Sequence, residues 1–177
     1  MGIVIKQNAT NYEKACVYRL SEKDIYSKVK DLITLSSDYN PGSPQCREFF
    51  SQIQNILLNA RLGKTAAEII QERYNPSGPT YGLTTWKGEK PTKADALIAK
   101  NYLTAEELMG LELMVEPFLG FALLFAYDGK ERTLGDWIKK LEQFLTVFEH
   151  LMLAGKGKIS RSSIVEKVNK TYYSTLK

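Results

Sequence analysis

Residues 133–148, TLGDWIKKLEQFLTVF, carry the pattern that decides the fold. Thr133 is a favoured residue for capping the start of a helix. Apolar side chains then recur at intervals of three and four, which places them on one face of an α-helix. The sequence predicts an amphipathic helix that continues to Leu153. Its apolar stripe contains Leu134, Trp137, Ile138, Leu141, Phe144, Leu145 and Phe148.

The same signals recur along the chain. Candidate capping residues precede periodic segments, and glycine or proline follows several of them. The expected helices begin at the caps Ser21, Ser43, Thr65, Thr92, Thr104, Thr133 and Ser160. Only residues 3–5, IVI, suggest a strand. We therefore predict an all-α fold, a single-domain helical bundle of about seven helices, with an N-terminal extension at 1–20 and the helical domain at 21–177.

Composition sets wide limits on function. The chain has 177 residues, 44% hydrophobic and 25% charged, with a net charge of +4. This is typical of a soluble globular protein, and the mild positive charge permits an anionic partner without requiring one. Two cysteines thirty residues apart and one histidine match no disulfide framework or zinc motif. We expect no metal and no cofactor, and a cytoplasmic protein, with secretion into a host left open.

Residues 108–127 form the most apolar run. The part free of charge, 117–127, is too short to span a bilayer, so we expect a buried core helix and no membrane span. Pro117 lies inside this helix and should either kink it or separate two helices near Val115.

Three further patterns are weak hints of chemistry. GKT at 63–65 resembles the end of a phosphate-binding loop, but the earlier glycine and strand are missing, which favours a helix stop followed by a cap. His150 has no nucleophile motif to serve, and a helix C-terminus favours a histidine in any case. Glu112 and Glu116 share a helix face, which a solvated surface also explains. We assign no catalytic residue.

The loop YGLTTWKGEK, residues 81–90, is a candidate binding loop. Stacking on its tryptophan and charge from its lysines could hold a base or an anion. The alternative, which we favour, is that Trp86 folds onto the core and anchors the loop. The candidate residues are Thr84, Thr85, Trp86, Lys87 and Lys90.

The C-terminal segment, residues 155–177, is basic and contains tyrosines. Such a segment can contact phosphates and bases, although a solvated helix with lysines near its end explains the pattern better. Its candidate residues are Lys156, Lys158, Arg161, Lys167 and Lys170.

Several motifs together resemble the RhuM family of bacterial virulence-associated proteins. They are, in order, FFSQIQNILLNARLGKTAAEIIQERY, GLTTWKGEKPTKADALIAKNYLTAEEL and TLGDWIKKLEQFL, with IYSKVKDLITLSSDYNP before them and AGKGKIS after them. The resemblance covers about residues 22–165. The sequence departs from the family pattern at VFEHLML, at Arg161 and at Pro117.

The resemblance implies a role in virulence and genes carried on pathogenicity islands or other mobile DNA, without an established molecular activity. Longer members place a helix-turn-helix DNA-binding module before this region, which this chain lacks. Our leading hypothesis is a non-enzymatic helical interaction domain, binding a protein or nucleic-acid partner through the loop and the basic segment. The alternatives are sequence-tolerant nucleic-acid binding, which predicts salt-dependent affinity, and an enzyme of unrecognised class. Oligomeric state is not indicated.

Overall fold

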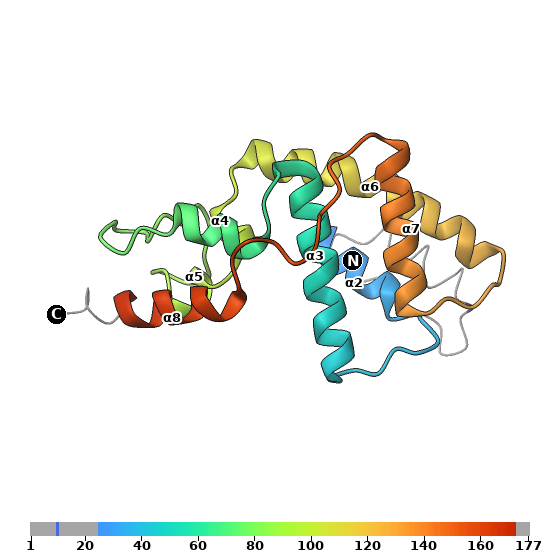
Figure 1. Cartoon of the computed structure of the whole chain (residues 1–177), viewed down its shortest axis with the longest axis horizontal. Coiled ribbons are helices and arrows are strands. Elements are labelled where there is room, and N and C mark those ends of the chain that lie inside the picture. Colours follow the sequence, from blue (N-terminus) through green and yellow to red (C-terminus); the bar gives the residue numbers. More distant parts are fainter. Residues whose placement is uncertain (1–9, 11–24, 173–177) are drawn as a thin grey trace. The chain divides into compact units, whose positions relative to one another are not determined.

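The computed structural model describes residue 10 and residues 25–172 (Figure 1). Within these residues it contains helices and no strand, which confirms the all-α prediction. The predicted strand at 3–5 and the cap at Ser21 lie outside the described residues. The helices are α2 (Ile25–Ile33), α3 (Pro44–Leu62), α4 (Ala66–Arg73), α5 (Lys93–Ala96), the 3-10 helix η1 (Ala99–Tyr102), α6 (Ala105–Tyr127), α7 (Leu134–Val147) and α8 (Arg161–Tyr172).

The chain divides into two compact units, a division that the sequence did not indicate. Unit 1 comprises residues 1–54 and 111–150, and unit 2 comprises residues 55–110 and 151–177. Helices α3 and α6 each contribute residues to both.

Aromatic packing between α6 and α7 forms much of the core of unit 1. The ring of Phe118 lies edge-on to Trp137 and to Phe144, with centroids 6.4 and 5.6 Å away. All three side chains are more than nine-tenths buried. Edge-to-face pairs at such distances add to the stabilisation from burial itself.

Unit 2 contains shorter helices that pack closely. Helix α4 contacts η1 and α8, and α5 also contacts α8, beside which it lies in Figure 1. Ile69 and Ile70 of α4 and Ile164 of α8 are completely buried. Two short helices and a 3-10 turn are too short to be stable alone, so tertiary contacts hold them.

Hydrogen bonds confirm the predicted caps within the described residues. At Thr65, Thr92 and Thr133 the threonine hydroxyl accepts from the third helical N–H, and the acid at that position accepts from the threonine N–H. Thr104 and Glu107 form the same reciprocal pair at the start of α6. These bonds satisfy N–H groups that have no partner within the helix.

Two predictions about helix length are wrong. The helix expected to reach Leu153 ends at Val147. Glu149 has a φ of 56°, its N–H donates to Thr146, and the N–H of His150 donates to Leu145. These two bonds form a Schellman motif, with a glutamate where glycine is usual.

The helix expected over 93–102 is interrupted between α5 and η1. The Tyr102 hydroxyl donates to the carbonyl of Ala96, and the Asn101 amide donates to that of Asp95. Side chains therefore bond carbonyls that an α-helix would have bonded through its backbone.

Helix α6 continues through Pro117, which excludes two helices meeting near Val115, one of the two alternatives predicted there; a kink stays a prediction. A proline at this position removes the bond to the carbonyl of Leu113. Leu113 and Pro117 are both exposed, on a side where water can bond that carbonyl. The expected core helix is present on one side only, because Leu113 and Leu124 are 71% and 61% exposed.

Candidate binding surface

The loop at 81–90 is joined to the end of α4 by a turn that only glycine can complete. Tyr81 and Gly82 both have positive φ, 56° and 82°, and the N–H of Leu83 donates to Thr80. These are the φ signs of a type I′ turn. A Cβ on Gly82 would lie 2.1 Å from the carbonyl oxygen of Arg73. The first glycine of GLTTWKG is therefore structural.

Thr84 then fixes the loop to η1, and Leu83 before it is buried. Leu83 is only 5% exposed. The Thr84 hydroxyl donates to the carbonyls of Asn101 and Leu103 at 2.9 and 2.7 Å, and the Thr84 N–H donates to Asn101 at 2.7 Å. This threonine is a site of loop attachment, which the sequence did not distinguish from a ligand contact.

The remainder of the loop, residues 85–90, is exposed; we call it the loop tip. Trp86 is 36% exposed, so the favoured prediction that it anchors the loop in the core is wrong. Lys87 and Lys90 are exposed on either side of Gly88, which has a φ of 77° and open space around it. The loop tip thus offers an accessible indole beside two ammonium groups.

Asp95 on α5 holds the far end of the loop tip. Its carboxylate accepts from the N–H of Thr92 at 2.9 Å and from the N–H of Lys87 at 3.5 Å. The hydroxyl and N–H of Thr92, followed by the N–H of Lys87, lower the pKa of Asp95. One buried carboxylate therefore caps α5 and closes the loop.

The turn GKGK, residues 155–158, packs against the segment GKT. A Cβ on Gly157 would lie 2.6 Å from the Thr65 methyl carbon. The N–H of Lys158 donates to Glu68 at 2.9 Å, while Glu68 also accepts from the N–H of Thr65 at 2.7 Å. These backbone donors, Thr65 first, lower the pKa of Glu68.

These contacts favour the structural interpretation of GKT. Gly63 ends α3 with a φ of 68°, and Thr65, 1% exposed, caps α4. A phosphate-binding threonine would need an accessible hydroxyl, and this one bonds Glu68.

The basic candidate residues of the C-terminal segment differ in whether their side chains bond other groups or are exposed. The Lys167 ammonium donates to the carbonyl of Gln71 at 3.1 Å, and Lys170 pairs with Glu166 at 2.6 Å. Lys167 therefore bonds a distant segment, whereas Lys170 is exposed and pairs within its own helix. Lys156, Lys158 and Arg161 are exposed at and just before the start of α8.

A clamp between Arg73 and Glu107 was missed by sequence reasoning. The Arg73 guanidinium forms two bonds of 2.6 Å to Glu107 and one of 2.8 Å to the carbonyl of Tyr102. Arg73 is the main cause that lowers the pKa of Glu107 to about 2. Thirty-four residues separate the two, and no local pattern indicates such a pair.

Charge differs strongly between the two units. Within residues 25–172, unit 2 has twelve lysines and arginines against seven acidic residues, a net charge of +5. Unit 1 has seven against ten, a net charge of −3. Three of the seven acids in unit 2, namely Glu68, Asp95 and Glu107, are engaged in caps. The loop tip and the turn at 155–158 therefore belong to a predominantly basic unit.

The remaining candidates do not form a chemical constellation. Glu116 pairs with Lys28 at 3.1 Å, Glu112 is exposed, and Cys46 is buried. His150 lies past the end of α7. Among residues 10 and 25–172, no three metal-binding side chains cluster.

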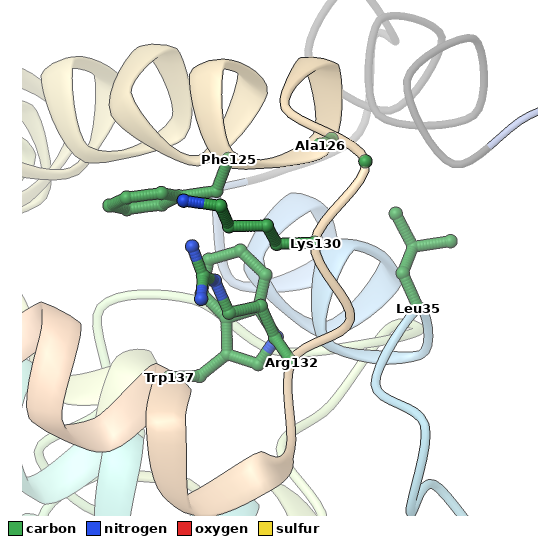
Figure 2. A pocket seen from close by; sticks show the side chains of 7 residues that line it. Leu35, Phe125, Ala126, Lys130, Arg132 and Trp137 are labelled. Carbon is green, nitrogen blue, oxygen red and sulfur yellow. The ribbon is translucent and has the colours of Figure 1, made fainter.

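Figure 2 shows a small pocket in unit 1 beside the end of α6. Its volume is about 30 Å³, and Leu35, Phe125, Ala126, Gly129, Lys130, Arg132 and Trp137 line it. Arg132 lies over the Phe125 ring at 4.8 Å. The Arg132 Nε and the Trp137 Nε1 are buried and have no hydrogen-bond partner among the residues that the structure describes. The space fits water or a small oxyanion, and the lining has no carboxylate or nucleophile.

One helix in the described part of the chain, α6, is long and apolar enough to cross a membrane, by length and composition only. One third of its most apolar window is buried in the protein.

Comparison with known proteins identifies the family. The Virulence protein RhuM family matches residues 11–176, nearly the whole chain. No curated protein and no solved structure matched. The match agrees with the motifs whose contacts are described above, and the chain belongs to the RhuM family of virulence proteins.

Proposed function

We propose that this virulence-associated chain is a non-enzymatic helical interaction domain that binds nucleic acid through unit 2. The observation that carries the proposal is the exposed Trp86 followed by the exposed Lys87 and Lys90, in a unit whose described residues have a net charge of +5. We expect it to act in the bacterial cytoplasm, as part of a mobile element or pathogenicity island.

Two kinds of contact would contribute. The ammonium groups of Lys87 and Lys90 at the loop tip, with Lys158 and Arg161, would neutralise phosphates. The Trp86 ring would stack on a base, a contact worth about 1–3 kcal/mol for each base. Because every base has a π-face, the binding would tolerate many sequences.

Rigid attachment supports a binding role for the loop tip. Gly82, Thr84 and Asp95 fix both ends of the loop, so little backbone freedom is lost when a ligand binds.

The test is a titration with single-stranded and duplex DNA and RNA, followed by tryptophan fluorescence. The variant Trp137→Phe leaves Trp86 as the one fluorescent indole, since the chain has two tryptophans. We expect quenching at about 50 mM salt and a 10-fold or larger loss of affinity at about 200 mM, given several phosphate contacts.

Matched variants distinguish the contribution of the loop lysines to affinity from that of the overall charge of the protein. Lys87→Ala with Lys90→Ala should weaken binding about 10-fold or more, whereas Lys139→Ala, an exposed lysine of unit 1, should change it less than about 2-fold. Circular dichroism checks that each variant stays folded. Absence of binding at low salt would contradict the proposal and leave a protein partner as the alternative.

A further inference from the structure

The side of α6 that faces away from the core is apolar and exposed. In unit 1, Leu113, Phe121, Leu124 and Tyr127 are 71%, 43%, 61% and 70% exposed. Val147 and Phe148 at the end of α7 are 77% and 56% exposed, and the Phe148 ring lies 4.7 Å from that of Phe144. Phe144 in turn lies 6.4 Å from Phe121. We call Leu113, Pro117, Phe121, Leu124, Tyr127, Val147 and Phe148 the apolar patch.

The composition of α6 is unusual for a helix with one side in water. Its buried side is formed by Leu111, Met114, Val115, Phe118, Leu119 and Ala122. Much of its opposite side is also apolar, with Glu112 and Glu116 along one edge, whereas α7 segregates its apolar and polar residues. A helix with apolar residues on two opposite sides is normally covered on both.

The size of the apolar patch favours a protein interface. Six of its large side chains are between 43% and 77% exposed, more apolar surface in one place than the few hundred Å² that a monomer usually exposes. A stable interface of standard size buries about 800 Å² on each partner. The patch would therefore supply part of one side of a dimer.

The spacing along α6 is symmetric about one point. Leu113 and Leu124 are equally far from the midpoint between Phe118 and Leu119, and so are Pro117 and Gly120. The four residues fall on one side of the helix, at intervals of four, three and four. Two such helices crossing antiparallel at this midpoint would place each Leu113 against the partner's Leu124.

We propose that the apolar patch is the interface between two copies of this chain, with their α6 helices antiparallel across a two-fold axis. A two-fold interface uses the same surface on both subunits, which a symmetric stripe fits. The short side chain of Pro117 and the absence of one at Gly120 let the two backbones approach at the crossing. The proposal rests on unit 1 and is independent of nucleic-acid binding.

Sedimentation equilibrium of the full chain tests the mass first. We expect a species of twice the chain mass of 20.1 kDa, with a dissociation constant in the micromolar range or below. Leu124→Glu and, separately, Leu113→Lys should each raise the dissociation constant at least about 100-fold, because each buries two unpaired charges in a symmetric interface. Glu112→Gln, an exposed position outside the patch, should leave it unchanged.

A charge exchange tests the antiparallel register. In the variant that combines Leu113→Lys with Leu124→Glu, each new cation faces the partner's new anion, so the dimer should recover at least about 10-fold relative to either single variant. The two positions are eleven residues apart, about 16 Å along the helix, so they cannot pair within one chain. Unchanged helical circular dichroism would show that the variants fold.

Three results would overturn the proposal. The wild-type chain could remain monomeric at all concentrations, or its dimer could be unaffected by both single substitutions. A monomer that floats with phosphatidylcholine vesicles, and loses this property with Leu124→Glu, would assign the patch to lipid instead.

Discussion

Different interactions stabilise the interior of each unit. Unit 1 depends on aromatic packing between α6 and α7, in which Phe118 contacts both Trp137 and Phe144. Unit 2 depends on carboxylates that accept backbone N–H groups at helix starts and turns, together with the Arg73–Glu107 pair. Apolar packing is indifferent to pH, whereas a hydrogen-bonded carboxylate is not. Unit 1 also has a capping carboxylate, Asp136, whose pKa is lowered by the N–H and hydroxyl of Thr133. The difference is one of degree, because the carboxyl whose pKa is lowered to about 2, that of Glu107, belongs to unit 2.

The family motifs divide in the same way. GKTAAEII, GLTTWKG and AGKGKIS all lie in unit 2, where Gly82 and Gly157 permit close contacts and Thr65 and Thr84 bond other segments. In GLTTWKG the first three residues attach the loop and the following residues are exposed. A single motif can therefore contain residues that attach a loop and residues that form a candidate binding surface.

The largest expected effect is in the core of unit 1. Phe118→Ala should lower the free energy of unfolding by about 3–5 kcal/mol, through lost burial and a cavity. Denaturant unfolding measured by Trp137 fluorescence, in a Trp86→Phe background, reports on unit 1. The same substitution should shift the Trp86 signal less, in a Trp137→Phe background. Equal losses at both reporters would contradict a difference between the units.

The next effect concerns the turn that opens the loop. Gly82→Ala should destabilise unit 2 by about 3 kcal/mol, because the new methyl group meets the Arg73 carbonyl and the backbone keeps a positive φ. Gly88→Ala, with a similar φ and open space, is the matched control and should cost about 1 kcal/mol. Thermal unfolding monitored at Trp86 gives both values, and similar costs would show that the close approach is unimportant.

A pH effect should distinguish the units directly. The pKa of Glu107 is lowered to about 2 when the chain is folded, from a usual value of 4.5. Its stabilisation is therefore complete above pH 4.5 and lost as the pH falls towards 2. We expect a loss of about 1–3 kcal/mol over this range, read at Trp86, after allowance for partial exposure. In Glu107→Gln the loss should be smaller; an equal loss would assign the effect to other carboxylates.

The smallest effect is at the end of α7. Glu149 occupies the left-handed position of the Schellman motif with a φ of 56°. Glu149→Gly should raise the free energy of unfolding by about 0.5–1 kcal/mol, because glycine adopts this conformation without steric cost. The reporter is Trp137 fluorescence. A loss of stability would indicate that the Glu149 side chain makes a contact that outweighs the strain.

Much of the fold was predictable from the sequence. Caps such as Thr65, Thr104 and Thr133 were identified because their hydrogen bonds connect residues only three positions apart. The candidate loop was likewise located by its glycines, threonines and tryptophan. The exposure of Trp86 was predicted incorrectly, because burial of an indole depends on segments distant in the sequence.

The amino-acid sequence by itself determined the all-α class, the helix starts and the family, since each depends on short-range spacing or on motifs read in order. The tertiary structure alone decided which glycine must be glycine, how Arg73 reaches Glu107, and that apolar residues on one side of α6 are exposed. The physical reason is the separation in sequence between the interacting residues. A cap is complete within one turn of helix, whereas close approach, ion pairing and burial depend on which distant residues the folded chain brings together.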